Sequence, residues 1–99
     1  MDYEDFTASL QQPAPPAGLS LALQALWFEG NKNWTQAHEL AQQDEGRDGA
    51  WVHAYLHRVE GDLGNAAYWY RRAGQPVQSV PLAQEWEALV RALLAQSDG

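Results

Sequence analysis

Residues 51–74 read Trp-Val-His-Ala-Tyr-Leu-His-Arg-Val-Glu-Gly-Asp-Leu-Gly-Asn-Ala-Ala-Tyr-Trp-Tyr-Arg-Arg-Ala-Gly, and this stretch decides the fold. In its first half, apolar residues recur at helical spacing, at Trp51, Val52, Tyr55, Leu56 and Val59. After Gly61, the carboxylate of Asp62 is suited to cap a second helix. That helix carries its own apolar stripe, at Ala66, Tyr70 and Ala73. Because the turn is so short, the stretch predicts an antiparallel helical hairpin.

Similar patterns extend outward in both directions. Upstream, apolar stripes predict one helix from near Leu19 and another after an Asn33 cap, and Asp48 is suited to cap the helix of Trp51. Downstream, Pro81 suits the first turn of a last helix. We therefore predict a single all-α domain over residues 19–97, with about five helices that form two antiparallel hairpins and a C-terminal capping helix.

The composition excludes several classes of protein. Ninety-nine residues are enough for one domain, and six Lys and Arg against thirteen Asp and Glu give a formal charge of -7. A surface that acidic repels nucleic acid and anionic membranes. Residues 1–18 are acidic and then proline-rich, which predicts a flexible arm and no signal peptide, and no apolar run is long enough to span a bilayer. We therefore predict a soluble cytoplasmic protein without nucleic-acid or membrane partners.

Two parts of the chain match each other 29 positions apart. In Trp34–Ala37 and in Leu63–Ala66, a bulky residue lies three positions before a small alanine, shortly after a hairpin turn. The second unit resembles the second helix of a tetratricopeptide repeat, through Gly61, Asp62, Leu63, Ala66, Tyr70, Ala73 and Pro76. The resemblance implies a helical repeat whose first helices line a peptide-binding face, and the fifth helix would then cover the last apolar face.

The first helix of this second unit departs from the tetratricopeptide pattern. Ala54 lies where the family has a small residue, but His53 and His57 replace the usual Leu and Tyr. The string from Trp51 to Asp62 is also similar to one shared by a group of small uncharacterised bacterial and fungal proteins. That second resemblance implies no activity.

A stripe of metal-ligating residue types follows this helix. His53, His57 and Glu60 lie at i, i+4 and i+7, so they project from nearly one line, and the spacing of the two histidines can hold a divalent metal. The alternative is structural, with both imidazoles packed between helices and hydrogen-bonded there. A fourth zinc ligand is not evident from the sequence.

A second group of residues combines aromatic rings with three of the six basic residues. It comprises Tyr55, Arg58, Tyr68, Trp69, Arg71 and Arg72, and Trp51 adds an apolar side chain beside it. Bidentate arginines backed by aromatic rings can bind a carboxylate, a phosphate or an acidic peptide. The alternative is that the rings are packing contacts and that the arginines pair with surface acids.

Binding is the function that these observations favour. We predict a non-catalytic module that binds an unknown protein or peptide, or a second copy of itself as a homodimer, through the groove around Trp51, Tyr55 and Arg58. The alternative is a small-molecule or metal site on the His53, His57 and Glu60 stripe, which would also suit an enzyme. The chain has no Cys, no phosphate-binding glycine loop and no motif for a catalytic nucleophile, so we predict no cofactor and favour a protein that is not an enzyme.

Overall fold

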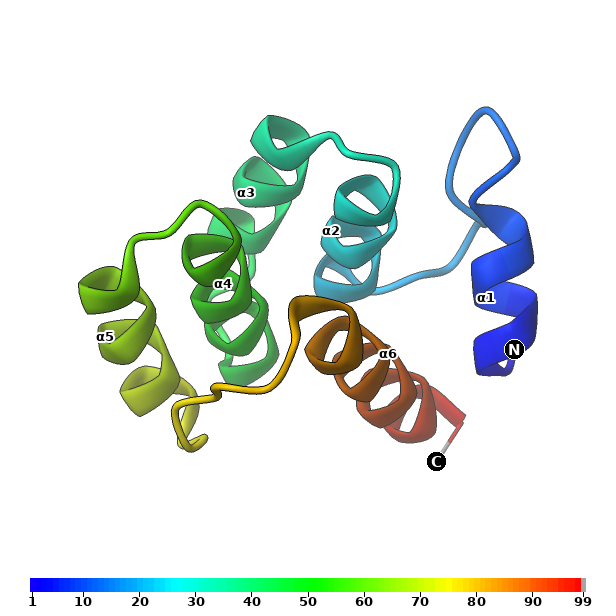
Figure 1. Cartoon of the computed structure of the whole chain (residues 1–99). Coiled ribbons are helices and arrows are strands. Elements are labelled where there is room, and N and C mark those ends of the chain that lie inside the picture. Colours follow the sequence, from blue (N-terminus) through cyan, green and yellow to red (C-terminus); the bar gives the residue numbers. More distant parts are fainter. Residues whose placement is uncertain (99) are drawn as a thin grey trace.

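The computed structural model describes residues 1–98, and every regular element in that range is a helix. The helices are α1 (Tyr3–Ser9), α2 (Leu21–Gly30), α3 (Trp34–Gln43), α4 (Arg47–Val59), α5 (Leu63–Ala73) and α6 (Leu82–Asp98) (Figure 1). The predicted all-α class is confirmed. The predicted number of about five helices is wrong by one, because a further helix forms within residues 1–18.

The additional helix, α1, lies in the segment predicted to be a flexible arm. It begins with a capping box, in which the Asp2 carboxylate accepts the backbone N–H of Asp5 at 2.8 Å and the Asp5 carboxylate accepts that of Asp2 at 3.4 Å. Phe6 is fully buried, and its ring centroid lies 5.9 Å from that of Trp86 in α6. Seven residues are too few for a stable isolated helix, so this docking holds α1 in place.

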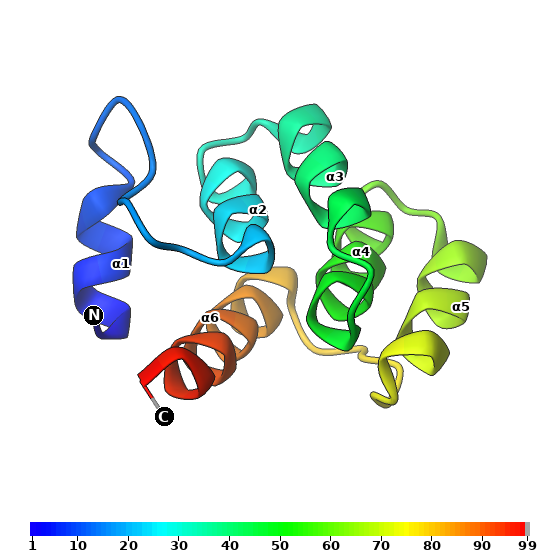
Figure 2. The ribbon, with the colours of Figure 1, turned by 180° about the vertical axis from the view of Figure 1, so that it is seen from behind.

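The helices follow one another in space much as they do in the sequence. Helices α2, α3, α4 and α5 lie side by side in chain order, and α6 packs against α1, α2 and α4 (Figures 1 and 2). The main core forms where α2, α4 and α6 meet, and it includes Leu26, Leu56 and Leu89. The indole N–H of Trp86 donates to the carbonyl of Leu26 at 3.0 Å, which fixes α6 against α2.

Side-chain caps also set the start of three further helices, α2, α3 and α5. The oxygens of Ser20, Asn33 and Asp62 each accept a backbone N–H three residues on, all at 3.2 Å. The predicted cap at Asp48 is wrong, because α4 begins earlier, after Gly46, and Asp48 lies in its first turn. Within residues 1–98, none of the helices combines the length and the apolar character needed to cross a membrane.

The close approach of the first turn of α4 to the end of α3 requires a glycine at position 49. A Cβ atom at Gly49 would lie 2.2 Å from the carbonyl oxygen of Asp44. We therefore expect Gly49→Ala to lower the free energy of unfolding by about 1–3 kcal/mol in urea denaturation. Gly64→Ala in α5 is the control, because the added Cβ atom would meet no atom closer than 4.0 Å. This substitution should stabilise the helix by about 0.5–1 kcal/mol. Equal stability of the two variants would contradict the close approach.

Candidate functional site

All three histidines of the chain meet at one place between α3 and α4. His38 comes from α3, and His53 and His57 lie one turn apart on α4. One ligating nitrogen from each ring lies within 4.8 Å of the other two. The Nε2 atoms of His38 and His53 face each other at 2.9 Å, so one imidazole donates a hydrogen bond to the other.

Two tryptophans, one from α3 and one from α5, stack on this three-histidine cluster. Trp34 of α3 stacks on His38 with ring centroids 4.8 Å apart, and Trp69 of α5 stacks on His53 at 3.9 Å. The indole N–H of Trp34 donates to the carbonyl of Leu56 at 2.8 Å, which ties α3 to α4 beside the cluster. The stacked rings restrict the rotation of the imidazoles and limit the access of water to them.

Glu60 holds the third histidine in one orientation. Its carboxylate lies 2.6 Å from Nδ1 of His57, so that nitrogen carries a proton and Nε2 is the nitrogen available to a metal ion. Carboxylate partners of this kind orient metal-bound histidines in known sites. Glu60 was predicted as a ligand beside His53 and His57, whereas the geometry brings His38 to that place and puts Glu60 behind His57.

A second group of possible ligands shares His57. One ligating atom each from His57, Glu60 and Asp62 also lie within 4.8 Å of one another. The Asp62 carboxylate, however, already caps α5 and accepts the side-chain amide of Asn65 at 2.8 Å. The two carboxylates are also exposed, so the three-histidine cluster is the better candidate for a metal site.

Burial keeps His38 and His53 neutral near pH 7. His53 is 4% exposed, and desolvation, followed by the charges of His38 and His57, lowers its pKa from 6.5 to about 4. Burial lowers the pKa of His38 as well, and the charge of His57 adds to that effect. Neutral imidazole is the form that binds metal ions, so at least two of the three rings need not lose a proton for binding at neutral pH.

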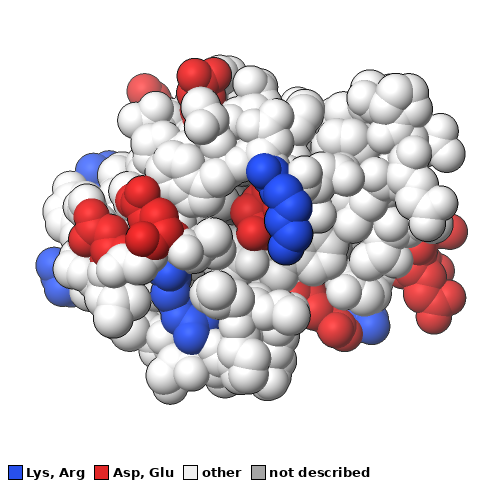
Figure 3. Space-filling model, turned by 45° about the horizontal axis from the view of Figure 1, so that its top comes forward, with Lys and Arg blue, Asp and Glu red and all other residues white. Residues whose placement is uncertain are grey.

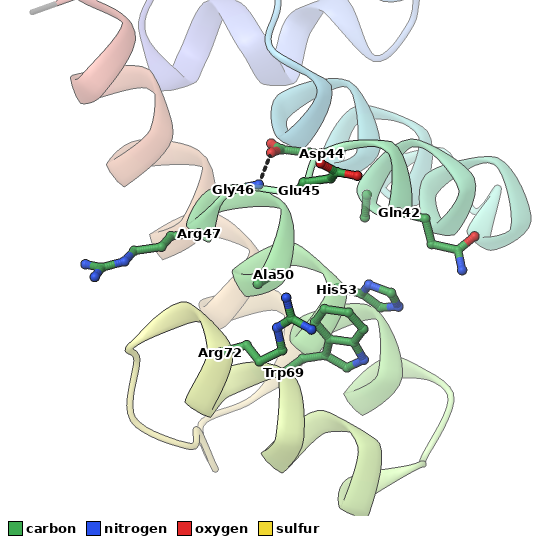
Figure 4. A pocket seen from close by; sticks show the side chains of 10 residues that line it. Gln42, Asp44, Glu45, Gly46, Arg47, Ala50, His53, Trp69 and Arg72 are labelled. Atoms are coloured by element: carbon green, nitrogen blue, oxygen red, sulfur yellow. Dashed lines mark hydrogen bonds between the residues drawn. The ribbon is translucent and has the colours of Figure 1, made fainter.

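A hollow of about 530 Å³ opens beside His53. Its walls come from the end of α3, the α3–α4 turn, α4 and α5 (Figure 4). The lining residues are Ala41, Gln42, Asp44, Glu45, Gly46, Arg47, Ala50, His53, Trp69 and Arg72. Of the three histidines, His53 is the one that lines this surface concavity.

Comparisons with known proteins do not assign a role to this site. No family model, curated protein or solved structure matches the chain. The chemistry of the site is therefore inferred from its own side chains.

The seven residues predicted to bind a partner lie in two separate environments. Tyr55 is only 2% exposed, and its hydroxyl donates to the Glu29 carboxylate at 3.2 Å. Trp51 is half-buried and packs against the core. The exposed members are on α5, and they are Tyr68, Arg71 and Arg72, with half-buried Trp69 beside them. The predicted groove around Trp51 and Tyr55 is therefore mostly occupied by core packing.

Arg58 takes part in a buried network that joins three helices. Its guanidinium pairs with the Glu85 carboxylate of α6 at 2.7 Å and donates to the carbonyl of Val80. The other Glu85 oxygen accepts the hydroxyl of Tyr70 from α5. Burial, followed by the hydrogen bond and charge of Glu85, raises the pKa of Tyr70. Arg58 is thus paired within the protein, but with a buried acid and not with a surface acid as the structural alternative predicted.

Charged side chains on the outer surface are dispersed. On the face in Figure 3, acidic groups lie in several separate places with single basic side chains among them, within a largely uncharged surface. Arg91 and Glu87, one turn apart on α6, form an exposed pair of this type at 2.8 Å. The acidic charge on this face is thus not gathered into one patch.

Proposed function

We propose that this protein binds a divalent transition-metal ion through His38, His53 and His57. The observation that carries the proposal is the convergence of the chain's only three imidazoles, with their ligating nitrogens within 4.8 Å of one another. Zinc–nitrogen bonds of about 2.0–2.1 Å in a tetrahedral site separate the nitrogens by about 3.3 Å. The 2.9 Å pair of His38 and His53 needs to open only slightly to reach that geometry.

The surroundings of the rings support a metal site over a purely structural role. The hydrogen bond between the His38 and His53 imidazoles satisfies those two rings alone, and it gives no reason for a third histidine beside them. The carboxylate of Glu60 behind His57 and the stacked tryptophans are the kind of surroundings that orient metal ligands. These features together favour a site built for an ion.

The ligand set narrows the class of metal. Imidazole nitrogens suit zinc, copper, nickel and cobalt, whereas magnesium and calcium require oxygen ligands. Three protein ligands leave a fourth position for water or another molecule. A zinc ion bound in this way makes its water acidic enough to act as a nucleophile near neutral pH, so the site has the minimum composition for hydrolytic chemistry.

Metal titration of the purified chain tests the proposal. We expect zinc or cobalt(II) to raise the midpoint of thermal unfolding and magnesium to leave it unchanged, with a stabilisation of about 2.7 kcal/mol when the free ion is at 100 times its Kd. Cobalt(II) bound by three imidazoles should also show the visible absorption of a tetrahedral site. His38→Ala and His57→Ala should each remove both signals.

Glu39→Gln is the matched control for these titrations. It removes an exposed charge next to His38 and leaves all three imidazoles in place, so zinc affinity should be retained. Zinc binding that survives in His38→Ala and weakens in Glu39→Gln would show that the ion is held by surface carboxylates. That result, or the lack of any shift with zinc and cobalt, would contradict the proposal.

We also propose that α2–α3 and α4–α5 are two copies of one tetratricopeptide-like unit. The loops of the two hairpins support it, because the N–H of Asn33 donates to Phe28 and that of Asp62 donates to His57, both at 2.9 Å. Equivalent loop positions carry a positive φ, at Lys32 and Gly61. Ala37 and Ala66, 29 positions apart, are both buried.

The peptide-binding role that this resemblance implies stays a prediction. One hollow of about 560 Å³ favours it, lined by Tyr3, Leu10, Glu29, Gly30, Lys32, Tyr55, Val59, Leu82, Ala83, Trp86 and Glu87. It opens on α2, α4 and α6, which include the first helix of each unit. The homodimer and the cytoplasmic location stay predictions as well.

A further inference from the structure

The hollow beside His53 has the size and polarity of a small-molecule site. Its volume of about 530 Å³ falls within the range of about 300–1,000 Å³ that is typical of ligand pockets. It is lined by one large aromatic ring, Trp69, and by charged groups of both signs. The metal proposal accounts for His53 in this wall, but it does not account for the other polar groups around the hollow.

Arg72 offers hydrogen-bond donors on one side. Its guanidinium carbon lies 5.2 Å from the ring centroid of Trp69 and 5.9 Å from that of Tyr68, and Nη1 donates to the Tyr68 hydroxyl at 3.2 Å. Arg58 and Arg91 both pair with glutamates, whereas no carboxylate among the side chains of residues 1–96 forms an ion pair with Arg72. In Figure 4 the guanidinium lies above Trp69 at the hollow. Its remaining N–H groups are therefore available for an anion.

Carboxylates lie at the other side. Asp44 and Glu45 follow the end of α3 and line the same hollow (Figure 4). One oxygen of Asp44 accepts the N–H of Gly46 at 2.9 Å, which fixes that side chain at the rim. Arg47 also lines the hollow, but in Figure 4 its side chain points away from the other groups. The lining of the hollow thus includes the Arg72 guanidinium on α5 and two carboxylates at the α3–α4 turn.

This separation of charge selects a class of ligand. A dianion such as a phosphate monoester or a dicarboxylate would be attracted by Arg72 and repelled by Asp44 and Glu45. A short zwitterion can satisfy both sides, with its carboxylate bound bidentately by the guanidinium and its ammonium group near the acidic rim. The methylene groups between its two charged ends would pack on the Trp69 ring.

We propose that this hollow binds a short ω-amino acid or a similar zwitterionic carboxylate, with Arg72 as its anion-binding residue. The site is distinct from the three-histidine cluster and does not require a metal ion. It shares only the His53 wall with that cluster, and the stacking of Trp69 on His53 places the two sites side by side.

Calorimetric titration with three ligands of similar length tests the proposal. The chelator-treated protein would be titrated with 4-aminobutyrate, butyrate and succinate. Only 4-aminobutyrate has an ammonium group for the carboxylates of Asp44 and Glu45, and succinate has a second carboxylate that they would repel. We expect 4-aminobutyrate to bind most tightly and succinate most weakly. Equal affinity for succinate and 4-aminobutyrate, or no heat of binding with any of the three, would overturn the proposal.

Two neighbouring arginines give a matched pair of variants. Arg72→Gln should weaken 4-aminobutyrate binding about tenfold or more, because a charge-assisted bidentate contact is lost. Arg71→Gln removes the adjacent exposed guanidinium, which does not line the hollow, and should leave the affinity unchanged. Glu45→Gln should reduce the difference in affinity between 4-aminobutyrate and succinate. Equal affinities in the two arginine variants would exclude Arg72 as the anion-binding residue.

The zinc titration of the Arg72→Gln variant separates the two proposals. Its zinc affinity should equal that of the parent protein, because Arg72 supplies no metal ligand. If zinc fails to bind to the parent chain while 4-aminobutyrate binds, only the metal proposal fails. If zinc binds and 4-aminobutyrate does not, only the ligand proposal fails.

Discussion

Replacement of Glu85 by alanine is expected to lower the free energy of unfolding by about 3–5 kcal/mol. Glu85 is 2% exposed and is the partner of both Arg58 and Tyr70, so its removal leaves a guanidinium and a hydroxyl in the interior without their acceptor. Urea denaturation followed by circular dichroism measures the loss. Glu85→Gln should be less damaging, because the amide oxygen still accepts one of the two hydrogen bonds.

The matched control lies half a turn further along the same helix. Glu87 forms an exposed ion pair with Arg91, and such pairs contribute about 0–1 kcal/mol, so Glu87→Ala should have little effect. A similar loss in both alanine variants would show that helix propensity and not the buried network sets the stability of α6. A Glu85→Ala protein as stable as the parent would contradict the network.

Phe6→Ala is expected to destabilise the protein by about 3–5 kcal/mol, which is the usual cost when a buried phenylalanine is truncated. The ring is fully buried against Trp86, although it belongs to a segment that the sequence predicted to be flexible. The free energy of unfolding, measured as for Glu85, checks the value. Glu4→Ala changes an exposed residue of the same helix and should stay within about 0.5 kcal/mol of the parent. An equally small effect of Phe6→Ala would mean that α1 does not dock.

The main helices could be predicted because their signals are local. Capping residues such as Asn33 and Asp62 act within one turn, and the apolar stripes of α3 to α6 repeat over ten residues or more. Helix α2 is instead apolar around most of its circumference, which also marks it as a buried helix. Helix α1 has only one fully buried side chain, Phe6, so it lacks a stripe to detect. Its one readable signal was the spacing of Asp2 and Asp5, which form the capping box.

The candidate site could be predicted only in part because it draws on two helices. His53 and His57 were visible as an i, i+4 pair on one helix. The third ligand, His38, lies on the preceding helix, and nothing within α4 points to it. A signal did exist, because His38 and His53 lie about equally far from the turn at Asp44–Gly46, and antiparallel neighbours bring such positions together.

The predicted binding residues show a limit of a different kind. An arginine beside aromatic residues has the same sequence pattern whether it faces solvent or a buried acid. The partner that decides between these for Arg58 is Glu85, which is 27 positions further along the chain, whereas Arg72 has no acidic partner in the described residues. Pairings across so many residues depend on how α6 packs, and local spacing does not contain that information.

The contact of α1 with α6 has a mechanical consequence. Tyr3 and Phe6 lie near one end of the chain and Trp86 near the other, with ring centroids 6.1 and 5.9 Å from Trp86. A pulling force applied between residues 1 and 98 is therefore resisted first by these aromatic contacts between α1 and α6. The hairpins that hold the histidines would bear load only after these contacts have broken, so the contacts protect the candidate site from a force applied at residues 1 and 98.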